Sequence, residues 1–163
     1  MKNLIRLIIS GILLCPLIGS MTSCSEEADC SATARAMMQC NLYKMNPETQ
    51  LVTKDTLDVL TVTAMGTDSV IINGQTNVSD ISLPLQFATD STTLIFLYGQ
   101  DGERKDTVII RHTNTPYFLS MDCGYQMKQH ITAVSWTSHL LDSIYIENPE
   151  AGIYEKENLK LFY

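Results

Sequence analysis

Long hydrophobic runs are scarce in this chain of 163 residues. The longest mostly apolar run covers residues 7–18, whereas a helix that crosses a bilayer needs about 20 apolar residues. Two basic residues, Lys2 and Arg6, come before the run, and small residues follow it. A basic start, a short apolar centre and a small-residue exit are typical of a secretion signal. We therefore predict that residues 1–23 are a signal peptide that takes no part in the fold.

Cysteine is also sparse, and one of the five lies directly after the predicted signal. The segment LIGSMTSC (residues 17–24) resembles the lipobox of bacterial lipoproteins, in which the cysteine receives diacylglycerol before cleavage. Met21 stands where that pattern prefers leucine. Cys15 is a rival, but the bulky Leu14 precedes it and cleavage there would shorten the apolar run. We predict lipidation at Cys24, because acyl chains of the palmitate type on one terminus anchor a protein firmly to a membrane.

Positive charge is scarce after the predicted cleavage. The chain has 11 Lys and Arg against 18 Asp and Glu, and the loss of Lys2 and Arg6 leaves nine against eighteen, a formal charge of −9. Such a surface repels phosphate groups, which excludes nucleic acid and disfavours anionic lipid headgroups. The lipid rather than a basic patch is expected to hold the protein at the membrane.

Residues 24–36 begin with the acidic stretch Cys24-Ser25-Glu26-Glu27 and are predicted to form a flexible tether. This stretch resembles the acidic export signal of Bacteroidetes lipoproteins, which implies an outer-membrane protein exposed on the cell surface. A plain solvated tether would equally suit the periplasmic face. The expected location is therefore the cell envelope, with a lipid anchor in the outer membrane and either face open.

A helical period of hydrophobic residues is absent from the rest of the chain, whereas alternation with a period of two recurs. We predict one all-β domain over residues 37–163, an antiparallel two-layer β-sandwich of the immunoglobulin-like kind. Pro84 places its strand at a sheet edge because proline lacks an N–H. The continuous apolar run over residues 94–98 predicts a central strand. The expected strands lie at residues 38–42, 57–64, 69–72, 81–87, 94–98, 107–111, 117–121, 130–137, 143–146 and 159–163.

Three cysteines remain after Cys24, and export from the cytoplasm permits a disulfide between two of them. Cys40 lies on the predicted inward face of a strand, where a free thiol behaves as a small buried hydrophobe. The favoured pairing is therefore Cys30 with Cys123. Cys40 with Cys123 is the competing pairing.

The sequence shows no closely spaced histidine pair that would bind a metal and no recognisable motif around a nucleophilic cysteine. His112, His130 and His139 are widely spaced, and metal sites usually contain two ligands close together on one element. Cys123 with His112 or His130 as its base would be a hydrolase, but no Gly-rich or oxyanion-forming context surrounds the cysteine. We predict a protein that is not an enzyme, with no catalytic residue, no metal and no cofactor.

The triplet Asp-Ser/Thr followed by an aliphatic residue or threonine occurs five times. Turn geometry explains much of this excess, since aspartate closes a turn, the hydroxyl residue caps it and a β-branched residue opens a strand. The triplet also resembles the O-glycosylation acceptor of exported Bacteroidetes proteins. The resemblance implies that one or more of five hydroxyls carries a glycan. These hydroxyls belong to Thr56, Ser69, Ser91, Thr107 and Ser143.

Aromatic residues make up only 7% of the chain, with Trp136 as the one tryptophan. Together with Tyr117, Tyr125 and Tyr145 it would form a sugar-stacking platform, although aromatic residues at alternating positions of a sandwich more often belong to the core. Glycan binding is therefore the alternative function, as a surface lipoprotein.

The run RHTNTPYFLSMDCG (residues 111–124) and the ending NLKLFY (158–163) resemble an uncharacterised family of Bacteroidetes envelope lipoproteins. The resemblance covers about residues 30–163 and supplies no activity. It implies an envelope setting beside an outer-membrane β-barrel protein. The sequence thus predicts a lipid-anchored, non-catalytic accessory or binding module, with a glycan as the other possible ligand and a cysteine hydrolase as the least favoured interpretation.

Overall fold

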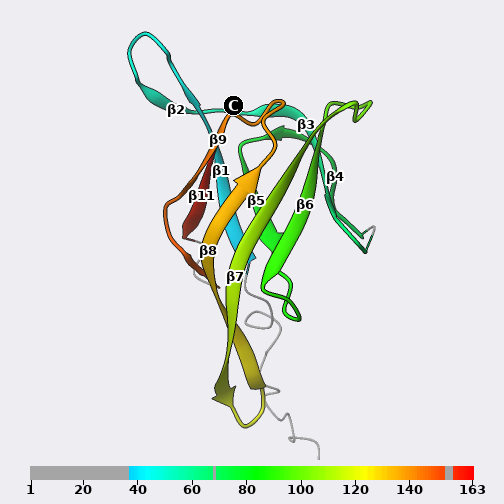
Figure 1. Cartoon of the computed structure of the whole chain (residues 1–163), viewed down its shortest axis with the longest axis vertical. Coiled ribbons are helices and arrows are strands. Elements are labelled where there is room, and N and C mark those ends of the chain that lie inside the picture. The colour runs from blue at the N-terminus through cyan, green and yellow to red at the C-terminus, as the bar shows by residue number, and fades with distance from the viewer. Residues whose placement is uncertain (1–36, 68, 153–155) are drawn as a thin grey trace, which may run out of the picture.

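The computed structural model describes residues 37–67, 69–152 and 156–163, and this part of the chain is all strand, turn and loop. Two sheets pack against each other as a β-sandwich (Figure 1). The expected all-β sandwich is therefore confirmed. The strands are β1 (Met37–Met45), β2 (Val52–Lys54), β3 (Leu57–Ala64), β4 (Ser69–Val78), β5 (Asp80–Pro84), β6 (Ser91–Tyr98), β7 (Arg104–Ser120), β8 (Gly124–Trp136), β9 (Ser143–Ile146), β10 (Glu150–Ala151) and β11 (Glu157–Phe162).

One sheet has six strands in the order β10-β8-β7-β6-β3-β4, and every neighbouring pair is antiparallel. The central position predicted for residues 94–98 is confirmed, since β6 pairs with both β3 and β7. Alternate residues of β6 are buried, Leu94, Phe96 and Tyr98 among them. Strand β4 forms the far edge and contains a bulge near Gly74, whose positive φ of 55° suits a residue without a side chain.

The other sheet is built around β1, which pairs with β2, β5 and β11. Pro84 lies in β5, which among the described strands pairs only with β1, so the predicted edge position is confirmed. Strand β11 runs parallel to β1, with Leu161 opposite Leu42, which departs from the purely antiparallel prediction. A parallel pair is possible here because the two strands are far apart in sequence and no tight turn joins them.

The core lies between the two sheets and takes alternate residues from each. Met38, Cys40 and Leu42 of β1 are buried, as the alternation of that segment predicts. From the opposite sheet Leu60 and Ile110 are fully enclosed. Loss of a side chain such as Leu42 would cost about 2–5 kcal/mol because the close-packed surroundings cannot collapse into the cavity.

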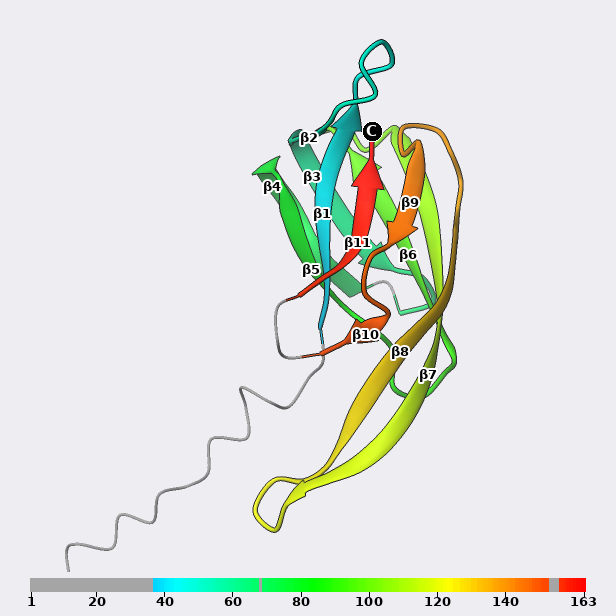
Figure 2. The same cartoon turned by 90° about the vertical axis from the view of Figure 1, so that its left-hand side faces the viewer.

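The hairpin of β7 and β8 is the main departure from the expected strands. Two separate strands were predicted at residues 107–111 and 117–121, but β7 continues through both over 17 residues. Its pairing with β6 ends at Arg111, and beyond that point β8 is its one described partner. Pro116 is therefore tolerated within the strand, since that stretch lies at a free edge. The outer part of the hairpin projects well beyond the sandwich (Figure 2).

Candidate functional site

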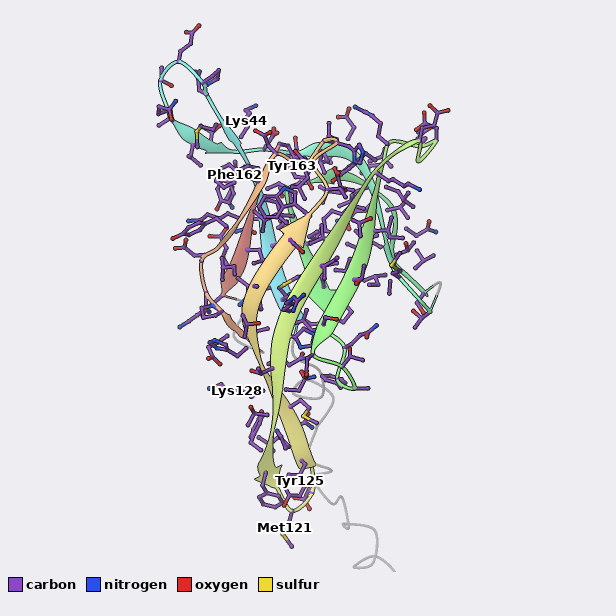
Figure 3. All side chains as sticks on the ribbon, viewed as in Figure 1. Lys44, Met121, Tyr125, Lys128, Phe162 and Tyr163 are labelled. Carbon is purple, nitrogen blue, oxygen red and sulfur yellow. The ribbon has the colours of Figure 1, made fainter. Side chains whose placement is uncertain are left out.

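Exposed apolar side chains gather at the end of the projecting hairpin. The structure describes thirteen exposed large hydrophobic residues, and five of them lie within residues 117–125, which we call the hairpin tip. Met121 is 90% exposed and Tyr125 is 74% exposed, and both lie at the far end of the described domain (Figure 3). The other three are Tyr117, Phe118 and Leu119. Contiguous apolar surface of this kind marks a contact site.

The hairpin tip has a defined internal structure. The rings of Phe118 and Tyr125 pack edge to face with centroids 5.6 Å apart across the two strands. The amide of Cys123 donates a hydrogen bond of 3.0 Å to the Ser120 hydroxyl, which closes the turn. Gly124 takes a positive φ of 66°, a conformation that other residues adopt at a cost. These contacts hold the apolar side chains outward on a shaped turn.

A cluster of polar and charged side chains on β8 and β10 lies near the base of the hairpin. Glu150 of β10 accepts from His130 Nδ1 at 2.7 Å and pairs with Lys128 Nζ at 3.2 Å. Hydrogen bonds from His130 and then Lys128 lower the pKa of the Glu150 carboxyl. We call Lys128, His130 and Glu150 the charged collar. It separates the apolar tip from the sandwich (Figure 3 labels Lys128).

A buried polar network lies beneath the collar, where the hairpin joins the sandwich. His112 Nε2 lies 2.9 Å from the Thr92 hydroxyl, and its Nδ1 lies 3.2 Å from Asn114 Oδ1. Gln129 Nε2 donates to the same Asn114 oxygen at 2.8 Å. Burial lowers the pKa of His112, although the hydrogen bond with Asn114 and the charge of Asp90 act the other way. The imidazole is therefore held neutral near pH 7.

Asn114 also ties the hairpin base to the segment between β5 and β6. Its Nδ2 donates to the carbonyls of Gln86, Phe87 and Thr89 at 3.2, 3.1 and 2.8 Å. Three carbonyls that lack strand partners thus share one amide group. The arrangement fixes the direction in which the hairpin leaves the sandwich.

A second buried group, Asp106, lies at the other end of β7. Its carboxylate is fully buried and accepts from the amides of His139, Leu140 and Leu141 and from the Thr137 hydroxyl, at 2.8–2.9 Å. Burial disfavours the charge, but these hydrogen bonds outweigh it and bring the pKa of Asp106 well below its usual range. The carboxylate holds the loop after β8 and is structural.

An apolar groove of about 550 Å³ runs along the edge of the sandwich, beside β4. We call it the edge groove. Val70 on its rim is 55% exposed, and Phe87 is 37% exposed. Its lining also includes Ala64, Ile71, Leu85 and Leu94.

Of the cysteines for which a role was predicted, the structure describes Cys40 and Cys123. Cys24 and Cys30 lie outside the described residues, so lipidation and the Cys30–Cys123 pairing stay predictions. Cys40 is a free thiol buried in the core, and burial with Glu157 nearby raises its pKa far above the usual range. The competing pairing of Cys40 with Cys123 is therefore wrong, because Cys40 lies in the sandwich and Cys123 at the hairpin tip.

The structure does not bring Cys123 together with a histidine of the hairpin. His130 lies opposite Thr113, seven residues along β8 from Cys123, on the order of 20 Å at the rise of an extended strand. His112 lies farther along, opposite Ile131. Neither of these two histidines is therefore placed to act as the base of Cys123.

The five candidate glycosylation hydroxyls lie at or near strand starts, as predicted. Four are exposed, but Thr107 is partly buried beside the enclosed Asp106. The triplet that begins with Asp106 is thus explained by packing. The four exposed residues are Thr56, Ser69, Ser91 and Ser143.

The aromatic residues suggested for sugar stacking do not form one platform. Trp136 packs against the core, and its Nε1 donates to the Asp142 carbonyl at 3.3 Å. Tyr145 lies on β9, in the other sheet, whereas Tyr117 and Tyr125 belong to the hairpin tip.

Two features were missed in the sequence. The polar networks of Asp106, Asn114 and Gln129 leave no mark in a single sequence, since polar residues are common in loops and strands alike. The hairpin tip does leave a signal, because Tyr117, Phe118 and Leu119 form an apolar run without alternation that directly follows Pro116. Such a run fits neither a half-buried strand nor a polar turn.

In the part of the chain that the structure describes, no cluster of three or more His, Cys, Asp or Glu side chains is placed to hold a metal ion. Over the same residues, no helix has the length and apolar character needed to cross a bilayer.

Fold and site together define a two-sheet β-sandwich domain with a projecting, apolar-tipped hairpin. The chain belongs to a family of unknown function, DUF6452, whose model matches residues 59–163. No curated protein and no solved structure matches it. The expectation of an uncharacterised family is confirmed, and the envelope setting implied by the resemblance stays a prediction.

Proposed function

We propose that this protein is a lipid-anchored, non-catalytic protein of the cell envelope that acts as an accessory or binding module for an outer-membrane β-barrel protein. The anchor is the acylated Cys24, after removal of residues 1–23. Binding is favoured over catalysis because the three described histidines are each engaged in structural contacts.

The edge groove is the observation that carries this proposal. An open edge strand, β4, borders a groove lined by apolar side chains. A partner segment in extended conformation gains main-chain hydrogen bonds from such an edge and apolar contacts from such a groove. Register shifts near Ile71 and near Gly74 limit this pairing to short parts of β4. We assign the groove to an extended segment of the β-barrel partner.

Site-specific photo-crosslinking in cells tests this assignment. A photoreactive amino acid at Val70, on the groove rim, is expected to give one discrete crosslink to an outer-membrane β-barrel protein. The matched control carries it at Leu51, which is similarly exposed at 61% but lies on the loop between β1 and β2. The proposal is overturned if Val70 gives no crosslink, or the same products as Leu51.

Intact mass of the protein purified from membranes tests the modifications on which the proposal depends. The expected mass lacks residues 1–23 and includes the acyl chains on Cys24. A loss of two hydrogens would report the Cys30–Cys123 disulfide, and added hexose masses would report glycan on Thr56, Ser69, Ser91 or Ser143. An unacylated chain that begins at Met1 would contradict the envelope role.

A further inference from the structure

The described domain begins beside the base of the projecting hairpin. Met37, the first residue of β1, forms a bridge with Gly152. The preceding residues Glu150 and Ala151 form β10, which pairs with His130 and Gln129 of β8. The chain therefore enters the domain at the end of the sandwich from which the hairpin projects, as Figure 2 shows for β1, β10 and β8.

The lengths of the two segments are compatible with a shared surface. Cys24 precedes Met37 by 13 residues, which span at most about 45 Å when fully extended. The hairpin extends five residues beyond Gln129 before its turn at Gly124, or about 17 Å. A bilayer that holds the acyl chains of Cys24 is thus within reach of the hairpin tip, with tether to spare.

The chemistry of the hairpin tip suits the interface of a bilayer. Tyrosine is enriched at membrane interfaces because its ring is apolar and its hydroxyl is polar, and Tyr117 and Tyr125 are both exposed here. Met121, the most exposed of the large apolar residues described, lies at the far end of the hairpin (Figure 3). The exposed Asp122 limits the depth to the headgroup region. The charged collar then stays in water.

We propose that the hairpin tip is a second membrane contact, which inserts into the same leaflet of the bilayer that holds the lipid anchor. This inference rests on the anchor at Cys24 in the proposed function. Zwitterionic lipid is the expected surface, because the mature chain is strongly acidic. Two contacts at one end of the molecule orient the sandwich upright and hold the loop between β1 and β2 away from the membrane, at the opposite end (Figure 1).

Fluorescence quenching in vesicles tests the contact. The acylated full-length mature protein carries either Met121→Trp or, as the matched control, Leu51→Trp at the opposite end. Both sites are exposed, so neither substitution disturbs the core, and Trp136 gives the same background in each. The proteins are reconstituted into phosphatidylcholine vesicles with or without brominated acyl chains. Bromine is expected to reduce the emission of the Met121→Trp variant roughly twofold and to leave that of the Leu51→Trp variant unchanged, because only an interfacial residue reaches the acyl chains.

Three other outcomes of this experiment would overturn the membrane contact, and they differ in what they say about the lipid anchor. If acylation is intact and the emission from position 121 is unaffected by bromine, the membrane contact is overturned and the lipid anchor stands. If position 121 becomes shielded only after an outer-membrane protein is added, the tip binds protein and the membrane contact is again overturned. If the purified chain lacks acyl groups on Cys24, the inference and the proposed function fail together.

Discussion

The Asp106 carboxylate accepts a hydrogen bond of 2.9 Å from the main-chain amide of Leu141, 35 residues later in the chain. Leu141 is itself fully buried, so this bond joins the start of β7 to a core residue of the loop that leads into β9. The loop crosses from one sheet to the other between β8 and β9. A single charged group thereby fixes the connection between the two layers.

The first prediction concerns Asp106→Asn. The asparagine side chain has an NH₂ group where the aspartate has a second acceptor oxygen, so this NH₂ group would face N–H donors of the loop. The free energy of unfolding is therefore expected to fall by about 3 kcal/mol. Urea unfolding followed by circular dichroism measures this. Asp142→Asn, on the exposed surface of the same loop, is the control and should change stability by less than about 0.5 kcal/mol. Equal effects of the two substitutions would contradict the assigned role.

The pKa of Asp106 adds a pH dependence to that comparison. Because the pKa is lowered in the folded protein, the charge stabilises fully above the ordinary aspartate pKa of about 4, and this contribution is lost as the pH falls below it. The gap between wild type and Asp106→Asn is therefore expected to narrow in acid.

The second prediction concerns His112, whose pKa is lowered by burial. The unfolded chain binds a proton below about pH 6.5, while the folded chain resists it, so stability falls as the pH drops from 7 to 5. One such group contributes a slope of at most about 1.4 kcal/mol per pH unit. The variant His112→Gln should show a flatter profile over this range. An unchanged slope in the variant would assign the dependence to other groups.

A third prediction follows from the position of Asn114. The variant Asn114→Ala leaves three carbonyls without their shared donor and is expected to lower stability by about 2–3 kcal/mol. Amide hydrogen exchange should become faster over residues 86–90, which the side chain now holds. Asn73→Ala, at an exposed site on β4, should leave both stability and exchange in that segment unchanged.

The fourth prediction concerns two buried tyrosines of the core. The buried hydroxyl of Tyr98 makes no hydrogen bond of ordinary geometry to a described residue, although burial, together with Tyr163 and Asp106 near it, raises its pKa; the ring of Tyr163 packs edge to face on that of Tyr98. Removal of an unpaired buried hydroxyl by Tyr98→Phe is expected to raise stability by about 1 kcal/mol. Tyr43→Phe breaks a 2.8 Å bond to Glu157 and should lower stability instead. A loss of stability in both variants would mean that Tyr98 has a partner.

The strands that pack on one core face could be predicted closely from the sequence. The bounds expected for residues 57–64 and 143–146 are those observed in β3 and β9, and the inward face of β1 follows the alternation of Met38, Cys40 and Leu42. These segments are half-buried, so burial imposes a period of two on their sequence.

The strands with other surroundings could not be predicted in the same way. Beyond Arg111, β7 loses its pairing with β6 and its inward residues are the polar His112 and Asn114, so the segment through Pro116 gives no apolar strand signal. The parallel pairing of β1 with β11 depends on which distant strands meet, and local sequence does not encode that. Strand β10 has two residues, too few to form any pattern.

The candidate site was harder to predict than the fold. The apolar run at the hairpin tip was interpreted as an ordinary strand, because exposure depends on how far the hairpin extends from the body. The hydrogen bonds of Asn114 and Asp106 join positions up to 35 residues apart, and single residues of these types carry no indication of such partners.

The parallel pair of β1 and β11 has a consequence for how the protein is made. Gln39 finds its partner in Glu157, 118 residues later, and β11 then separates β1 from β9. Chains released in order from a ribosome or a secretion channel deliver this strand after every other described one. Until β11 is available, Leu42 and the other residues of β1 have no strand partner on that side, and β9 is not joined to β1 through β11. Synthesis that stops short of residue 157 is therefore expected to yield an incompletely paired sheet that proteases can attack, rather than a smaller working domain.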